Sequence, residues 1–321
     1  MKKKTVYWWM SGIVVLTIAA FAAIYFLNLQ SVVKQVPNMV NSDGPPSFAQ
    51  EIYGDFKNPL DKPMDVAKIG EFIYVSDTNH KQVQVFDQSG APVFKFGKEG
   101  QGKGQFTFPY GIAGDKNDNV YVADLYNGKI SIFDSKGKFL RYFNDKKKVL
   151  GAPAGLRIYN DKLYVTDVQE SKLFVFNLKG DKLMQISTGV NKKDLFKAPN
   201  AVAIDKKNND IFVCDSGNQR VLEFDKNGKY VRTINGSKDG QGGSVFVNPR
   251  GIGVDSRGIL YVVNNLSHMV YGFDEKGAQA FTFGSMGDQN EQFYLPNGLF
   301  VDDNDHVYVT DTANARVALY N

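Results

Sequence analysis

The chain contains 321 residues, of which 43% are hydrophobic and 13% aromatic, and this composition excludes a disordered protein because it can bury a large core. The single cysteine excludes a framework of intramolecular disulfides. The formal net charge is +4, but three positive charges belong to the lysines at positions 2–4, so the rest of the chain lacks the basic surplus typical of nucleic-acid binding.

An uncharged apolar run follows these lysines and extends from Tyr7 to Leu29. As a helix it would be roughly 34 Å long, enough to cross a hydrocarbon core of about 30 Å. A cleaved signal peptide is the alternative, but the run continues for seven residues past the cleavage-like Ala20-Phe21-Ala22. We therefore predict that residues 1–30 are cytoplasmic lysines and an uncleaved single-pass anchor in the cell membrane. The positive-inside rule then places everything after residue 30 outside the cytoplasm.

Residues 31–47 are polar and rich in proline, which predicts a linker. Residues 48–321 contain a unit that recurs six times and opens on a proline every 44 to 50 residues. In each unit a short apolar strand is followed by a strand ending in Asp or Asn, and an aromatic–Asp/Asn pair closes a third strand ten residues later. The opening prolines are Pro63, Pro109, Pro153, Pro199, Pro249 and Pro296.

A glycine three residues beyond the aromatic pair predicts a hairpin into a fourth strand. Four short antiparallel strands without a helix, repeated at about 45 residues, indicate the blade of a β-propeller. The pattern resembles the NHL repeat, with its Pro-x-Gly-apolar opening and its YVxD strand, over roughly residues 48–321. We therefore predict an all-β, six-bladed propeller of four-stranded antiparallel blades, preceded by one transmembrane helix.

The sixth unit supplies only three strands, because Tyr320-Asn321 is the pair that closes the third strand. A strand before the first unit can replace the missing one. Ile52-Tyr53-Gly54 matches Lys95-Phe96-Gly97 in sequence, with Tyr53 at the position of Phe96. We expect this N-terminal strand to complete the last blade and close the ring, which would remove an exposed sheet edge.

The recurring Asp of the second strand is followed five residues later by a basic or amide residue in five units, whereas the fifth unit has Asn264 and Met269. This joint loss of acid and base favours a structural pair within each blade over a functional site. We interpret His80 and His268 as solvated turn residues, His306 as a strand-entry residue and Cys214 as a buried small hydrophobe. We predict no metal site from them.

Candidate ligand-binding residues are those near the axis where large or charged side chains replace small ones: Tyr110, Asn200, Arg250, Asn297 and Asp65. The Pro-x-Gly openings are also similar to those of the peptidyl-hydroxyglycine amidating lyase, which implies zinc-ligand histidines directly after the prolines. None of the six residues at those positions is His. A six-bladed lactonase would instead use oxygen ligands, for which Asp65, Asn200 and Asn297 are the candidates.

We interpret the protein as an extracytoplasmic binding or scaffold module for a protein, a peptide or an envelope glycan, with no catalytic residue, no cofactor and no nucleic-acid partner. The alternative is a propeller enzyme, either amidating-lyase-like or a metal-dependent lactonase or hydrolase, for which Ca²⁺ or Zn²⁺ remains open. RNA binding, which some cytoplasmic NHL proteins perform, is disfavoured by the predicted export and the low net charge. Either face of the ring remains open as the binding face.

Overall fold

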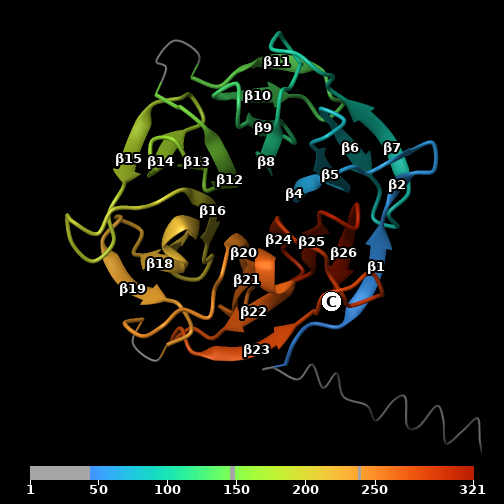
Figure 1. The fold of residues 1–321 in the computed structure, drawn as a ribbon. Coiled ribbons are helices and arrows are strands. Elements are labelled where there is room, and N and C mark those ends of the chain that lie inside the picture. The colour runs from blue at the N-terminus through green and yellow to red at the C-terminus, as the bar shows by residue number, and fades with distance from the viewer. Residues whose placement is uncertain (1–43, 145–148, 238–239) are drawn as a thin grey trace, which may run out of the picture. The chain divides into compact units, whose positions relative to one another are not determined.

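The computed structural model describes residues 44–144, 149–237 and 240–321. Residues Pro45–Asn321 form one compact unit of six four-stranded antiparallel sheets arranged around a common axis (Figure 1). The predicted six-bladed β-propeller is thus confirmed. The predicted anchor at residues 7–29 lies outside the described residues, and none of the described ranges contains a helix long and apolar enough to cross a bilayer.

Each blade orders its strands from the axis outward. The innermost strands are β4 (Pro63–Ile69), β8 (Pro109–Gly114), β12 (Pro153–Tyr159), β16 (Pro199–Ile204), β20 (Pro249–Val254) and β24 (Leu299–Val301). The second strands are β5 (Phe72–Asp77), β9 (Val120–Asp124), β13 (Lys162–Asp167), β17 (Ile211–Asp215), β21 (Leu260–Asn264) and β25 (Val307–Asp311). The third strands are β6 (Gln82–Phe86), β10 (Lys129–Phe133), β14 (Lys172–Asn177), β18 (Arg220–Phe224), β22 (Met269–Phe273) and β26 (Arg316–Tyr320). The outer strands are β7 (Pro92–Phe96), β11 (Phe139–Tyr142), β15 (Lys182–Ile186), β19 (Tyr230–Ile234), β23 (Gln279–Phe283) and β1 (Phe48–Ile52).

Four small elements lie outside this pattern. Strands β2 (Gly54–Asp55) and β3 (Asn58–Pro59) form a short hairpin after β1. Two 3₁₀ turns, η1 (Ser216–Asn218) and η2 (Asn265–Ser267), connect the second and third strands of blades four and five, where no helix was predicted. Both turns end on a residue with positive φ, which directs the chain back into the third strand.

The last blade is completed by the N-terminal strand. Strand β1 pairs antiparallel with β26 in the sheet β1-β26-β25-β24, and the two strands lie side by side at the seam in Figure 1. Ser47 and Asn321 extend the pairing by exchanging two backbone hydrogen bonds, each 2.8 Å long. The predicted closure of the ring is therefore confirmed.

The predicted register of β1 is wrong by one residue. Phe96 pairs with Val83 in the first blade, and Ile52 pairs with the corresponding Val317 in the last, so Ile52 rather than Tyr53 occupies the position of Phe96. This position faces the hydrophobic cluster between two blades, which favours the aliphatic side chain of Ile52 over the phenol of Tyr53. Tyr53 is 50% exposed and donates a hydrogen bond to Glu51.

Hydrophobic clusters lie between neighbouring blades rather than within a single central core. Inner strands approach so closely that many positions two residues after the opening proline must be small. A Cβ atom on Gly111 would lie 2.0 Å from the carbonyl oxygen of Ala154, and one on Gly298 would lie 2.6 Å from that of Met64. In the four blades that have it, the glycine of the Pro-x-Gly opening is therefore required by the packing of neighbouring inner strands.

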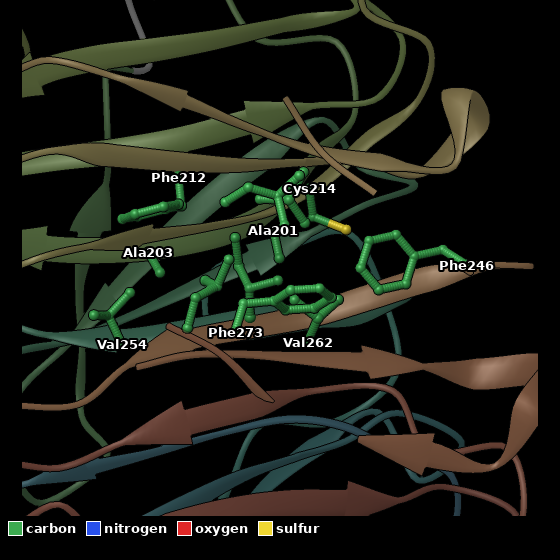
Figure 2. Packing of buried hydrophobic residues seen from close by; sticks show 12 residues of the cluster. Ala201, Ala203, Phe212, Cys214, Phe246, Val254, Val262 and Phe273 are labelled. Carbon is green, nitrogen blue, oxygen red and sulfur yellow. The ribbon is translucent and has the colours of Figure 1, made fainter. Parts of the chain in front are cut away.

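Cys214 shows this packing between blades four and five. Its side chain is fully buried in a cluster that includes Val262, Phe246 and Phe273 from the following blade (Figure 2). Burial raises the pKa of the Cys214 thiol to about 12. The predicted role as a small buried hydrophobe is confirmed.

We expect Cys214 to be inert toward a thiol reagent such as Ellman's reagent in the native protein, because only the exposed thiolate reacts. One equivalent should react after unfolding in guanidinium chloride. Val231→Cys, at a position that is 45% exposed on β19, provides a reactive control. Rapid reaction of the native wild-type chain would contradict this packing.

The recurring Asp residues hold the loop that enters each blade. Asp124 accepts hydrogen bonds from the N–H groups of Thr107 and Phe108, and Asp215 accepts one from Lys197. In the fifth blade Asn264 Oδ1 accepts the equivalent bonds from Val247 and Asn248. A neutral amide oxygen accepts these backbone hydrogen bonds without needing a cation to balance its charge. This explains why the fifth blade has Asn264 in place of the acid and Met269 in place of the base.

The predicted pairing of the recurring Asp with the residue five positions later is confirmed only in part. Asp215 pairs with Arg220 at 2.9 Å, and Asp311 pairs with Arg316 at 2.8 Å. Gln82 likewise donates to Asp77 at 2.7 Å. The two lysines differ: Lys129 lies 4.7 Å from the ring centre of Tyr142, and Lys172 pairs with Glu170. The structural role thus belongs mainly to the acid.

Candidate binding site at the propeller axis

The structure brings all five predicted ligand-binding residues together at the axis, where the inner strands begin. Asn200 accepts a hydrogen bond from the Tyr110 hydroxyl, and Asn297 Nδ2 donates to Tyr110 at 3.1 Å and to the carbonyl of Met64 at 2.8 Å. The cavity among these residues has a volume of about 10 Å³, hardly more than one water needs. Tyr110, Asn200, Asn297 and Asp65 are each about 5–6% exposed. We call this closed cluster the axial plug.

Arg157, which the sequence reasoning missed, lies beneath the axial plug and connects four blades. It extends from β12 and pairs with Asp65 of β4 at 3.7 Å. Its guanidinium also donates to the carbonyl oxygens of Ile252 in β20 and Leu299 in β24. The signal was present in the sequence, because the equivalent positions in four other blades hold only Ala or Gly.

Burial raises the pKa of Asp65 to about 6, although Arg157 and the N–H of Ile112 act to lower it. Since the pKa in the folded state lies above that of an unfolded chain, the native state binds this proton more tightly. The stabilisation that this bound proton contributes has its full value below about pH 4 and is lost as the pH rises through about 6.

We therefore expect the stability advantage of wild type over Asp65→Asn to shrink by about 2–3 kcal/mol between pH 4 and pH 7, as a shift of two pKa units implies. Urea unfolding at several pH values measures this difference. Asp118→Asn, at an exposed turn position, is the control and should keep the wild-type profile. Parallel pH profiles for wild type and Asp65→Asn would contradict the assignment.

An open cavity of about 500 Å³ lies on the opposite side of Arg157, at the end of the propeller where the inner strands turn into the second strands. All six blades contribute to it. Small residues on the inner strands, Ala67, Ala113, Ala203 and Gly253, leave this space open, and Phe300 lies beside the Arg157 guanidinium at 5.5 Å. The volume is within the range of natural ligand pockets. We call it the turn-side cavity.

Charged residues surround the turn-side cavity in pairs that join different blades. Lys68 pairs with Asp302 at 3.2 Å, and Lys116 pairs with Asp161 at 2.8 Å. Lys206 reaches from the fourth blade to Asp303 in the sixth. The cavity therefore combines an apolar wall with a polar, charged rim, whereas the axial plug offers little accessible surface.

The three histidines lie apart from both sites. His80 is an exposed turn residue bonded to Asp77, and His306 directly precedes β25, as predicted. His268 is not a solvated turn residue: it stacks on Tyr294 at 5.4 Å, and its Nδ1 accepts the N–H of Leu295. Across residues 44–144, 149–237 and 240–321, no group of three or more His, Cys, Asp or Glu side chains is placed to hold a metal ion.

Comparison with known protein families agrees with the fold. A family model described as a 6-bladed β-propeller matches residues 57–145 and 144–239, and an NHL repeat model matches residues 293–319. The Drosophila melanogaster protein brain tumor is 26% identical over 191 residues, which are 59% of this chain and 14% of that protein. Lin-41 of Caenorhabditis elegans is 45% identical over 49 residues, 15% of this chain and 4% of that protein. The chain thus spans only a small part of the curated relatives that it matches.

Solved structures show the same architecture at low sequence identity. A virginiamycin B lyase from Staphylococcus aureus superposes with a TM-score of 0.57 and 12% identity, over 82% of this chain and 81% of the lyase. A protein of unknown function from Bacteroides thetaiotaomicron reaches a TM-score of 0.62 at 14% identity, over 87% of this chain and 74% of that one. These similarities establish the fold alone.

Proposed function

Because the chain belongs to the 6-bladed β-propeller family and carries an NHL repeat, we propose that it is a binding module that takes a peptide segment of a partner protein into the turn-side cavity. The observation that carries the proposal is a cavity of about 500 Å³ built by all six blades, with an apolar wall and a charged rim. An apolar side chain of the partner would displace water from the wall, while its backbone would hydrogen bond to the polar rim.

A selection from random peptide libraries on the immobilised full-length chain tests this proposal. We expect a consensus whose binding is lost in Ile158→Trp, which places a large ring in the turn-side cavity from a half-buried position. Val231→Trp, at a half-exposed position on outer strand β19, is the matched control and should bind normally. Peptides that bind Ile158→Trp as well as wild type would contradict the site, and so would the absence of any enriched peptide.

We also propose that residues 7–29 anchor the propeller in the cell membrane, with the propeller outside the cytoplasm. The support is the uncharged run behind three N-terminal lysines. Alkaline extraction of membranes should leave the full-length chain in the pellet and release a chain that begins at residue 44. Release of both chains would disprove the anchor, and alkaline phosphatase fused after Asn321 should be active only if the topology is correct.

A further inference from the structure

The turn-side cavity is closed at its inner end. Arg157 lines both this cavity and the axial plug, and the space within the plug has a volume of only about 10 Å³. A polypeptide therefore cannot pass along the axis from one face of the ring to the other. A ligand that fills the cavity to its floor must enter as a chain end or as a single protruding side chain.

The charged side chains near the floor of the turn-side cavity indicate which chemical group binds there. Lys68 and Arg157 are the two least exposed charged side chains of the cavity, at 17% and 15% exposure. Their partners, Asp302 and Asp65, are not among the described residues that line it. Both basic residues thus line the space, whereas the carboxylates that balance them do not.

These cations retain hydrogen-bonding capacity. The Lys68 ammonium has three N–H donors, and the described residues accept one of them, through Asp302 at 3.2 Å. The Arg157 guanidinium uses its two terminal nitrogens on backbone carbonyls, and its Nε–H has no acceptor among the described residues. An anion at the floor would therefore meet unused donors on two side chains that are largely shielded from solvent, where charge-assisted hydrogen bonds are stronger than at the surface.

The rim carries charges of both signs. Asp161 and Asp303, the carboxylates that line the cavity, are 57% and 90% exposed, and each pairs with a lysine of the rim, Lys116 or Lys206. Between mouth and floor the wall is formed by small and branched apolar residues such as Ala113, Ile158 and Ala203. The order from outside to inside is balanced charge, then apolar, then cationic.

We propose, resting on the peptide-binding function above, that the turn-side cavity recognises the carboxyl-terminal end of a polypeptide that carries an apolar last side chain. The terminal carboxylate meets Lys68 and Arg157 at the floor, and the apolar side chain contacts the wall. An internal segment cannot pass through the floor, and a protruding Asp or Glu offers a carboxylate without the apolar side chain that a carboxyl-terminal residue carries beside it.

The test compares one peptide in two chemical forms. A fluorescein-labelled peptide, selected on the full-length chain from a library with free carboxyl termini, is made as the acid and as the carboxamide, and both are titrated by fluorescence anisotropy. We expect the acid to bind at least tenfold more tightly. Lys68→Gln, which keeps a donor for Asp302, should remove most of this difference, whereas Lys229→Gln in an exposed outer hairpin should preserve it.

Equal affinity of the acid and the carboxamide would overturn the inference. The inference would also be overturned if binding peptides came only from libraries that display internal or amino-terminal segments, and if Ile158→Trp abolished their binding. That result would leave the peptide-binding function intact. Octanoate tests whether an apolar carboxylate suffices: tighter binding of octanoate than of the peptide acid would assign the cavity to a small lipid acid instead. Failure of every library would contradict the proposed function itself.

Discussion

A chain that lacks residues 47–57 should lose about 5 kcal/mol or more of stability, or fail to fold, although it loses only one strand. The deletion removes the partner of β26 and takes Ile52, which is 1% exposed, out of the cluster between the last and first blades. It also removes Glu51, which pairs with the buried Arg316. Loss of a buried aliphatic side chain and of one member of a buried ion pair each costs several kcal/mol.

Thermal unfolding followed by near-ultraviolet circular dichroism measures this loss. Deletion of residues 31–41, which has the same length and lies in the predicted linker, is the control and should leave the transition unchanged. A synthetic peptide covering residues 46–60, added to the chain that lacks residues 47–57, should raise its transition temperature, and a scrambled peptide should not. An unchanged melt after deletion of residues 47–57 would disprove closure by β1.

Replacement of Arg316 by Met should cost about 3–5 kcal/mol, because it leaves two carboxylates without their cation in the core. Arg316 is 2% exposed and pairs with Asp311 and Glu51. It also donates to the backbone carbonyls of Asp288, Gln289 and Gln292. One side chain thus ties together β25, β1 and the loop that enters the last blade.

Arg220→Met provides the matched comparison, since Arg220 occupies the same position in the fourth blade and pairs with Asp215 and Asp194. Its side chain is 15% exposed, and the blade is held by covalently continuous strands, so a smaller loss is expected. Chemical denaturation of both variants measures the difference. If Arg220→Met proved equally or more destabilising, the special role of Arg316 at the seam would be wrong.

The fold could be predicted because its determinants are local and repeated. The opening prolines, the second-strand acids and the hairpin glycines each satisfy a requirement within one blade, so their spacing identifies the blade. Gly90 and Gly137, for example, have φ values of 81° and 78°, as the hairpin prediction requires. The register of β1 could not be read in the same way, because an extra residue stands between Ile52 and Gly54.

The candidate site was predicted only in part, because its decisive contacts cross blades. The five predicted residues do meet at the axis, but the hydrogen bonds that Tyr110 makes with Asn200 and Asn297 close the space that the five were expected to line. The open cavity depends on where Arg157 and Lys206 reach, and Lys206 extends from the fourth blade to the sixth. Arg157 itself interrupts the Ala or Gly that recurs at its position, but the partners of Arg157 and Lys206 leave no periodic signal in the sequence.

The seam also determines the order in which the protein assembles. Within the first blade strands pair over short sequence separations, as between Val83 and Phe96, whereas β1 and β26 pair Phe48 with Tyr320. Among the strand pairs of the described residues that contact has the largest loop-closure entropy, so the ring should close last, after the individual blades have formed. Interactions formed after the rate-limiting barrier act on the rate of unfolding rather than of folding. Residues of the seam such as Arg316 therefore set how long the ring stays closed once it has formed.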